Sequence, residues 1–250
     1  MKNNENKLIS ILFILLALPF LGFAQDNPNS DLSFEVHQIY PAIPMQKAEL
    51  KEVQNLTDLN KNYKSSWIKT YIAVEISVSY KGKIRKAISK NDVLSQKQKN
   101  LIEKADYGTA ISVKVRYIPD NKLIDNDIKV IDFVCMISPE IEATYPDGQA
   151  ALRQYLKDAA IDKIPESIFT GYALAAVKFT IDEKGAVTNV SIFESAKDEA
   201  VDKLLLNAIQ NMSTWNPATF ANGLTVKQEF VLTLGNMNSC VMNLLHIRRD

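Results

Sequence analysis

The sequence predicts an α+β protein in two parts, a β-rich part followed by one that mixes helices and strands. Between residues 34 and 137, apolar and polar residues alternate in several stretches, which is typical of half-buried strands. Beyond residue 144, two stretches carry apolar residues at helical spacing, and strand-like stretches follow each of them. This order favours a small antiparallel sheet that is covered by helices on one face.

The first 24 residues have the composition of a leader that is removed on export. Two lysines precede an uncharged apolar stretch over residues 8–24, and small residues stand at the −3 and −1 places before Gln25. As a helix this stretch spans about 25 Å, less than the roughly 30 Å hydrocarbon core of a membrane. We expect a signal peptide over residues 1–24 and export to the periplasm or outer membrane. The alternative is an inner-membrane anchor through residues 8–24.

Length and charge limit the organisation and the partners of the remaining chain. About 225 residues suit two small domains, which we place at residues 25–140 and 141–250, with the core of the second over about 145–234. The 29 basic residues balance the 29 acidic ones, and removal of the leader leaves a net charge near −1. This balance argues against a nucleic-acid partner, because such proteins normally carry a basic excess.

The first domain is predicted from four strand-like stretches and one helix. In the clearest stretch, Ile72, Val74, Ile76 and Val78 alternate with smaller or polar residues. The predicted strands are residues 71–80, 83–88, 111–118 and 129–137. The helix is predicted to begin at Ser95, because Ser95 and Gln98 form the pattern of a capping box. We expect a sandwich-like β-rich domain with this single helix.

The second domain is predicted as helix, hairpin, helix and strand. A helix over about 149–160 has Leu152 and Leu156 on its apolar stripe, and a second helix of about fifteen residues starts at Asp198. Two apolar runs that flank a glycine-containing loop predict a hairpin between these helices. The hairpin strands are residues 172–181 and 187–193, and the last strand is residues 226–234.

Several residues of this domain occur in a distinctive order. The stretch Tyr145-Pro146-Asp147-Gly148 opens the first helix, Gly185 lies in the hairpin loop, and a Trp-x-Pro pattern with a later glycine precedes the last strand. Over about ninety residues this order resembles the TonB C-terminal domain family, in the form of the TonB-like secreted proteins of Bacteroidetes. The residues that we expect to maintain this fold are Tyr145, Pro146, Gly148, Gly185, Trp215, Pro217 and Gly223.

The resemblance implies a mode of binding. Domains of this family receive an extended peptide from an outer-membrane receptor by adding it as a strand to their sheet. By analogy the receiving edge is the last strand, with the residues Val226, Gln228, Phe230 and Leu232. The implied partner is a protein, such as a TonB-dependent outer-membrane receptor, and the implied process is transmembrane transport. The alternative is that the chain's own tail, Gly235 to Asp250, covers this edge.

Three features of the chain differ from an energy-transducing TonB. The leader looks removable, the prolines between residues 25 and 140 are scattered rather than gathered in a spacer, and the tail extends past the usual end of the domain. A binding or adaptor role is therefore expected. The alternative is a structural component of a cell-envelope assembly that uses the fold only as an interaction module.

No motif predicts an enzyme. The two histidines, His37 and His246, stand at opposite ends of the chain, and there is no nucleophile elbow, no phosphate-binding glycine loop and no H-E-x-x-H. We expect a non-enzymatic protein without metal, cofactor or small-molecule substrate. Two buried thiols are the favoured interpretation of Cys135 and Cys240, and a disulfide between them is the alternative.

Overall fold

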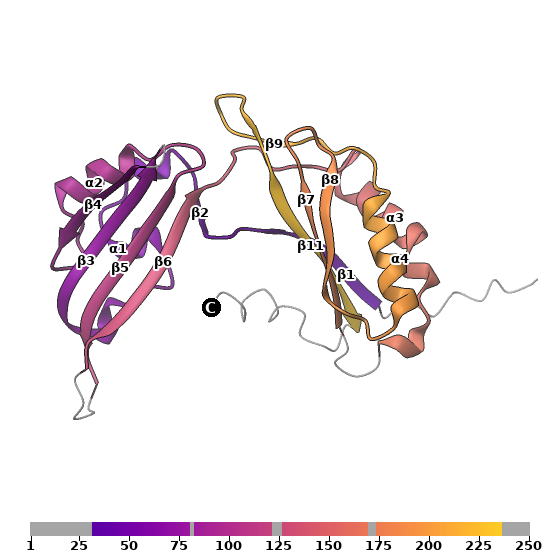
Figure 1. Ribbon diagram of the computed structural model, residues 1–250, viewed down its shortest axis with the longest axis horizontal. Helices are drawn as coiled ribbons and strands as arrows, with labels where there is room; N and C mark the ends of the chain where they lie inside the picture. Colours follow the sequence, from indigo (N-terminus) through magenta and orange to yellow (C-terminus); the bar gives the residue numbers. More distant parts are fainter. Residues whose placement is uncertain (1–31, 81–82, 122–126, 170–173, 237–250) are drawn as a thin grey trace, which may run out of the picture.

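The computed structural model describes residues 32–80, 83–121, 127–169 and 174–236, which form two lobes, each built on one sheet (Figure 1). The predicted signal peptide, most of the tail, His246 and Cys240 lie outside these ranges. Within them, no helix combines the length and the apolar character that crossing a membrane requires. The described residues confirm a mixed α+β protein in which most neighbouring strands are antiparallel.

The first lobe contains a five-stranded sheet in the order β2-β6-β5-β3-β4. All neighbours are antiparallel except β2 and β6, which are parallel. The strands are β2 (Ile43–Met45), β6 (Lys129–Ile137), β5 (Ala110–Pro119), β3 (Ile68–Tyr80) and β4 (Lys83–Ser89). Short helical segments accompany them: η2 (Glu49–Lys51), α1 (Leu56–Leu59), η3 (Ser65–Trp67) and α2 (Gln96–Glu103).

Helix α2 begins where the capping box predicts. The Ser95 and Gln98 side chains each bond the other residue's backbone N–H. Gln98 is fully buried and also donates to the carbonyl of Val74 in β3 at 2.9 Å, which ties the helix to the sheet. The predicted apolar face of β3 is confirmed for Val74, Ile76 and Val78, all buried. Ile72 is only half-buried, because the pairing with β5 shifts register between Tyr71 and Ala73.

The expected sandwich is not observed in the first lobe. Its described residues form a single sheet, and helical segments cover the face where a second sheet was expected. Leu56 and Leu59 of α1, together with Leu50 of η2, are buried in the same core as Ile102 of α2. The strand periodicity was therefore a sound guide to the sheet, but it gave no information about these short helical turns.

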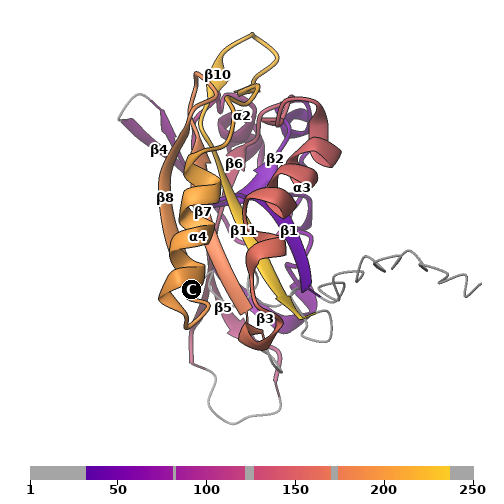
Figure 2. The same cartoon turned by 90° about the vertical axis from the view of Figure 1, so that its right-hand side faces the viewer.

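The second lobe contains a four-stranded antiparallel sheet in the order β1-β11-β7-β8, with both long helices on one face (Figure 2). Its elements are β1 (Leu32–Ile39), α3 (Gly148–Ala159), η4 (Ile161–Lys163), η5 (Glu166–Ile168), β7 (Leu174–Ile181), β8 (Val187–Glu194), α4 (Glu199–Gln210) and β11 (Gln228–Asn236). A small hairpin of β9 (Ala218–Thr219) and β10 (Thr225–Val226) precedes β11. Asp198 caps α4 by accepting from the N–H groups of Ala200 and Val201.

The chain crosses from one lobe to the other directly after β1. Strand β1 precedes the first lobe in sequence but pairs with β11, the last described strand of the second lobe. The segment of residues 40–42 then leads directly into β2 of the first sheet. The predicted division at residue 140 therefore differs from the structure in one strand, because residues 32–39 belong to the second sheet.

The small hairpin also joins the lobes. The ring of Phe220, between β9 and β10, lies with its centroid 4.1 Å from that of Tyr107 in the first lobe. Glu140 accepts hydrogen bonds from Tyr107 Oη at 3.5 Å and from the N–H of Ala221 at 2.7 Å. Phe220 is accordingly buried within the core of the first lobe.

Candidate partner-binding site

Strand β11, the predicted receiving edge, is paired on both sides. On one side it pairs with β7, and on the other it pairs with β1 over eight residue pairs, from Leu32 opposite Asn236 to Ile39 opposite Glu229. The chain's own β1 therefore occupies the edge that the resemblance assigns to a partner. The alternative cover, the tail, begins inside β11 at Gly235, and its residues 237–250 lie outside the described ranges.

The four predicted site residues are placed in two different strands. Gln228, Phe230 and Leu232 lie in β11 and are 4%, 3% and 0% exposed. Val226 lies in β10, where it pairs with Ala218, and it is half-buried. The side chains of Phe230 and Leu232 point into the core with the helices, so β11 pairs with its neighbouring strands through backbone groups.

The apolar residues of β1 occupy alternate positions and face the helices. Phe34 is 5% exposed, and Leu32 and Val36 pack partly buried against the same core. Arg153 of α3 makes two contacts with Phe34. Its guanidinium lies 4.5 Å from the ring centroid and donates a hydrogen bond to the Phe34 carbonyl at 3.2 Å. Apolar and polar residues alternate in the stretch Leu-Ser-Phe-Glu-Val-His, which is typical of a strand. Nothing in the stretch indicates that this strand pairs with β11.

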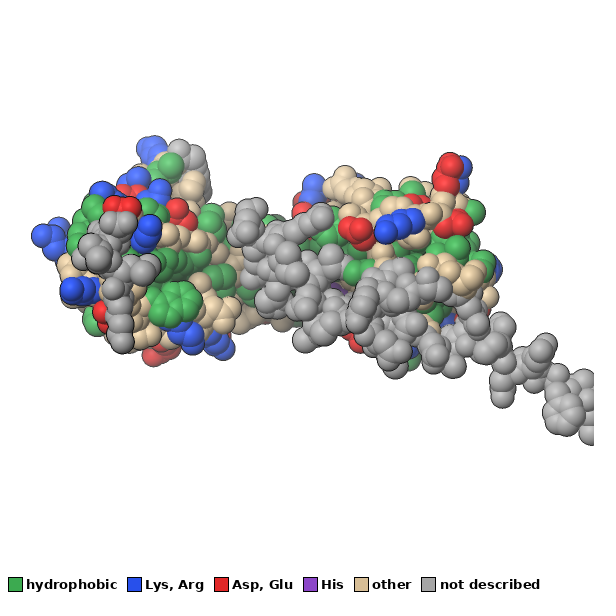
Figure 3. Space-filling model, turned by 90° about the horizontal axis from the view of Figure 1, so that it is seen from below, with side chains coloured by type: hydrophobic (Ala, Val, Ile, Leu, Met, Phe, Trp, Pro, Cys, Tyr) green, Lys and Arg blue, Asp and Glu red, His purple; other side chains and the backbone are tan. Residues whose placement is uncertain are grey.

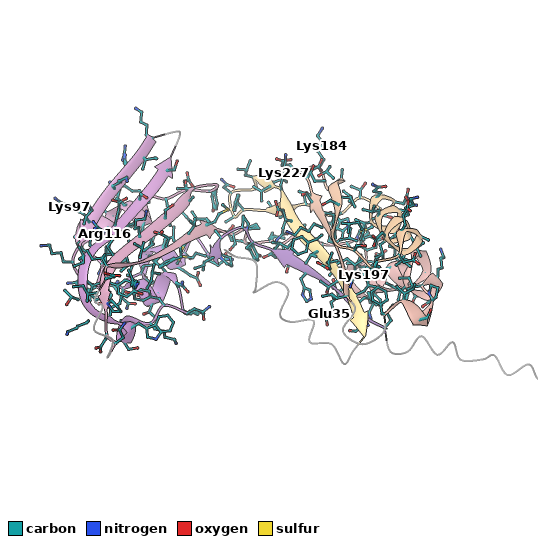
Figure 4. The ribbon with its side chains drawn as sticks, turned by 60° about the horizontal axis from the view of Figure 1, so that its bottom comes forward. Glu35, Lys97, Arg116, Lys184, Lys197 and Lys227 are labelled. Atoms are coloured by element: carbon teal, nitrogen blue, oxygen red, sulfur yellow. The ribbon has the colours of Figure 1, made fainter. Side chains whose placement is uncertain are left out.

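The opposite face of β1 is polar. His37 Nε2 lies 2.9 Å from Glu35 Oε2, and both side chains are substantially exposed. In Figure 4, Glu35 lies on β1 beside the end of β11. In the described part of the chain, no three His, Cys, Asp or Glu side chains gather as metal ligands.

A polar cluster fixes the point where β1 leaves the second sheet. Glu142 accepts hydrogen bonds from Tyr40 Oη and from Gln228 Nε2, and Gln228 Oε1 accepts from the N–H of Ala143 at 2.8 Å. Burial and the neighbouring Glu142 carboxylate together raise the pKa of Tyr40 well above its usual range. We call Tyr40, Glu142 and Gln228 the latch, because they join the end of β1 to the start of β11.

The signature residues of the predicted fold meet around Trp215. Its ring lies 5.0 to 6.0 Å, between centroids, from the rings of Tyr145, Phe179 and Phe230. Its backbone N–H donates to the carbonyl of Gly185 at 2.9 Å. A Cβ built on Gly185 would stand 1.9 Å from the Trp215 carbonyl oxygen, and the φ of Gly185 is +83°, so only glycine fits there.

The remaining signature residues lie at turns. Pro146 and Gly148 stand at the start of α3, where Gly148 has a φ of +82°. Pro217 follows Asn216, whose backbone forms a bridge with Thr144. Gly223, with a φ of +83°, forms the turn between β9 and β10. These residues shape the turns of the second lobe.

The thiol of Cys135 is buried in the first lobe. It is 0% exposed and donates to the carbonyl of Leu59 at 3.3 Å. Burial raises its pKa to about 12, so the reactive thiolate is scarce at neutral pH. Cys135 is a free cysteine. Cys240, which was also expected to be buried, lies outside the described residues.

Figure 3 shows the two lobes from below, with charged side chains of both signs on each. A wide cleft of about 1740 Å³ is lined by residues of both sheets and of the segment 49–62. Its walls carry charged residues of both signs, and several are already paired. Lys86 Nζ lies 2.7 Å from Glu75 Oε1, and Lys178 Nζ lies 3.7 Å from the ring centroid of Phe193.

No family model, curated protein or solved structure matches this chain.

Proposed function

We propose that this is a non-enzymatic, exported protein of the cell envelope that binds an extended segment of a protein partner by strand addition at β11. In this proposal β1 covers the edge in the absence of the partner and dissociates from β11 when the partner strand binds. The observation that carries the proposal is the pairing of β1 with β11. This edge of the sheet already binds an antiparallel strand that is remote from β11 in sequence.

Exchange of one strand for another is energetically accessible at this edge. The incoming strand replaces the backbone hydrogen bonds of β1, so their net contribution changes little. The main loss is the burial of Phe34, which contributes on the order of 1.5–3 kcal/mol, and the smaller burial of Leu32 and Val36. A competing segment therefore needs apolar residues at three alternate positions.

The TonB resemblance suggests that the partner segment belongs to a TonB-dependent outer-membrane receptor. A second candidate is a structural role in which β1 of one copy completes the sheet of another. The path of the chain favours this alternative, because residues 40–42 connect β1 of the second lobe to β2 of the first. This segment can serve as a hinge when two copies exchange their β1 strands. The two candidates differ in oligomeric state when the partner strand is absent.

A peptide with the sequence of β1 and its flanking residues, Asp31 to Tyr40, tests the exchange in the full chain. We expect the fluorescein-labelled peptide to bind at micromolar concentrations, in a reaction limited by departure of the chain's own β1. A peptide with serine in place of Phe34 should bind about tenfold more weakly or worse, because it loses the buried ring. Fluorescence anisotropy measures both peptides.

A disulfide lock provides the matched control. Glu35 and Thr233 are directly opposite, so the variant Glu35→Cys with Thr233→Cys, in a Cys240→Ser background, places two cysteines within bonding reach. The oxidised variant should not bind the peptide, and reduction should restore binding. Equal binding by both forms would contradict the proposal. A stable dimer that takes up peptide only on dissociation would favour the structural role.

A further inference from the structure

We propose that the outer edge of β4 is a second docking surface, which takes an acidic, extended segment of a protein partner. This surface lies in the first lobe and is independent of β11. Strand β4 is one of four strands at the edges of the two sheets, the others being β1, β2 and β8. Figure 2 shows β4 at the rim of its sheet.

The other three edges carry features that oppose strand addition. On β1, the carbonyl of Phe34 already accepts a hydrogen bond from Arg153. Strand β8 contains Asn189 with a φ of +52°, and its pairing with β7 has two register shifts. Strand β2 has three residues, one of which is Pro44. Bulges, prolines and short length are the usual means by which proteins protect an edge.

Strand β4 has a regular backbone with exposed apolar side chains. It pairs with β3 over seven consecutive residues without a register shift. Ile84 and Ile88 are 65% and 63% exposed and lie on the same face of the strand, with Lys86 between them. A strand added to this edge would cover both isoleucines with its own apolar side chains.

The charge of this edge is entirely positive. Residues 83–90 include Lys83, Arg85, Lys86 and Lys90 and no acidic residue. Lys86 is paired with Glu75, whereas for Lys83, Arg85 and Lys90 no acidic partner lies within 4 Å among the described residues. Lys83 and Arg85 project on the face opposite Ile84, because successive side chains of a strand alternate.

These cations decide the chemistry of the partner. Pairing of β4 with β4 of a second copy would place like charges side by side, which is unfavourable. A segment in which acidic and apolar residues alternate would instead place its carboxylates beside Lys83 and Arg85 and its apolar residues beside Ile84 and Ile88. The same cations that oppose self-association therefore select an acidic strand.

A peptide of alternating glutamate and valine, eight residues long and labelled with fluorescein, tests this proposal on the full chain. We expect binding that weakens as salt rises, because the cations are exposed. The variant Lys83→Glu with Arg85→Glu should weaken binding about tenfold or more, since two attractions become repulsions. The matched variant Lys157→Glu with Lys203→Glu, on α3 and α4, should bind within about twofold of wild type.

N-methylation of the peptide separates strand addition from simple attraction between charges. Methyl groups on alternate amides remove hydrogen-bond donors from one side of the peptide only. One of the two alternating sets should abolish binding and the other should leave it intact. Equal binding of both methylated peptides would overturn the proposal, and so would binding to phosphatidylglycerol vesicles without binding to the unmodified peptide.

The locked variant Glu35→Cys with Thr233→Cys distinguishes this surface from the β11 edge. It should bind the acidic peptide as well as wild type does, since β4 is untouched by the lock. Loss of acidic-peptide binding on oxidation would place that peptide at β11 and contradict the assignment to β4. Circular dichroism of the Lys83→Glu and Arg85→Glu variant checks that the sheet still forms.

Discussion

Gly185 and Trp215 act as one structural contact in the second lobe. The glycine allows the β7–β8 hairpin to turn with a positive φ, and the lack of a side chain lets the Trp215 backbone approach. The indole then fills the space between helices and sheet beside Tyr145, Phe179 and Phe230. Its buried Nε1 has no hydrogen-bond partner among the described residues, so the contacts that hold the ring there are packing contacts.

This contact predicts unequal effects of two glycine substitutions. Gly185→Ala should lower the free energy of unfolding by about 2 kcal/mol or more, because it combines backbone strain with a clash against a backbone oxygen. Gly223→Ala has the same positive φ but nothing within 4 Å of the new Cβ, so it should cost only about 1 kcal/mol. Urea denaturation measures both, and equal losses would contradict the argument.

The raised pKa of Cys135 predicts how the stability of the fold changes with pH. Its folded-state pKa of about 12 lies above the ordinary value of 9.0, so the folded state holds the thiol proton more tightly than the unfolded state. The resulting stability is present below pH 9 and is lost as pH rises toward 12. In a Cys240→Ser background, alkylation by iodoacetamide at pH 8 should be slow in the native protein and fast in denaturant. Rapid native labelling would contradict the burial.

At the scale of elements, helix α2 depends on a single glutamine. Gln98 completes the capping box with Ser95 and also bonds the carbonyl of Val74. Ser95→Ala should lower the free energy of unfolding by about 1 kcal/mol, the usual cost of a lost cap. Gln98→Leu should cost about 1–3 kcal/mol, because it also leaves a buried carbonyl unpaired. Exposed Gln96→Ala is the control, and equal effects of all three would refute this role.

Local patterns in the sequence predicted most elements because each pattern reflects local burial. The alternation around Val74, Ile76 and Val78 identified β3, and the spacing of Leu152 and Leu156 identified α3. The predicted start of α4 at Asp198 is also confirmed, because its side chain caps the helix. Short elements such as α1 have too few residues to establish a period, so the sequence did not predict them.

The pairing of β1 with β11 could not be predicted in the same way. No strand was predicted at residues 32–39, and the alternation of Leu32, Phe34 and Val36, although typical of a strand, does not identify the neighbouring strand. Without an alignment of related sequences, strands that are far apart in the chain carry no local mark of their pairing. The predicted last strand is present as β11, although Val226 lies in β10, and the pairing of β11 with β1 was not predicted.

At the scale of the whole molecule, two connections differ in what they join. The latch of Tyr40, Glu142 and Gln228 joins β1 to β11 within the second lobe, and the contact of Phe220 with Tyr107 joins the two lobes. Only the latch lies at the end of β1, so it affects departure of β1 from the sheet. Residues of both sheets and of the segment 49–62 line the cleft.

The latch predicts a change in rate. Tyr40→Phe removes the hydroxyl that donates to Glu142, and it should speed uptake of the β1 peptide about fivefold by weakening the end of β1 by about 1 kcal/mol. Tyr107→Phe is the control, because it removes a hydroxyl at the other connection and should leave the rate unchanged. Stopped-flow anisotropy measures both rates. Equal acceleration by the two variants would place the control of β1 elsewhere.

The most direct test of the account is amide hydrogen exchange of the full chain, followed by mass spectrometry, with and without the unlabelled β1 peptide. Without peptide, the amides of Leu32–Ile39 should be protected, but less than those of β7, because β1 is an edge strand and β7 is a central one. Saturating peptide should remove the protection of β1 and leave β7 protected. Protection of β1 that does not change on peptide binding, or that falls together with that of β7, would contradict strand exchange at β11.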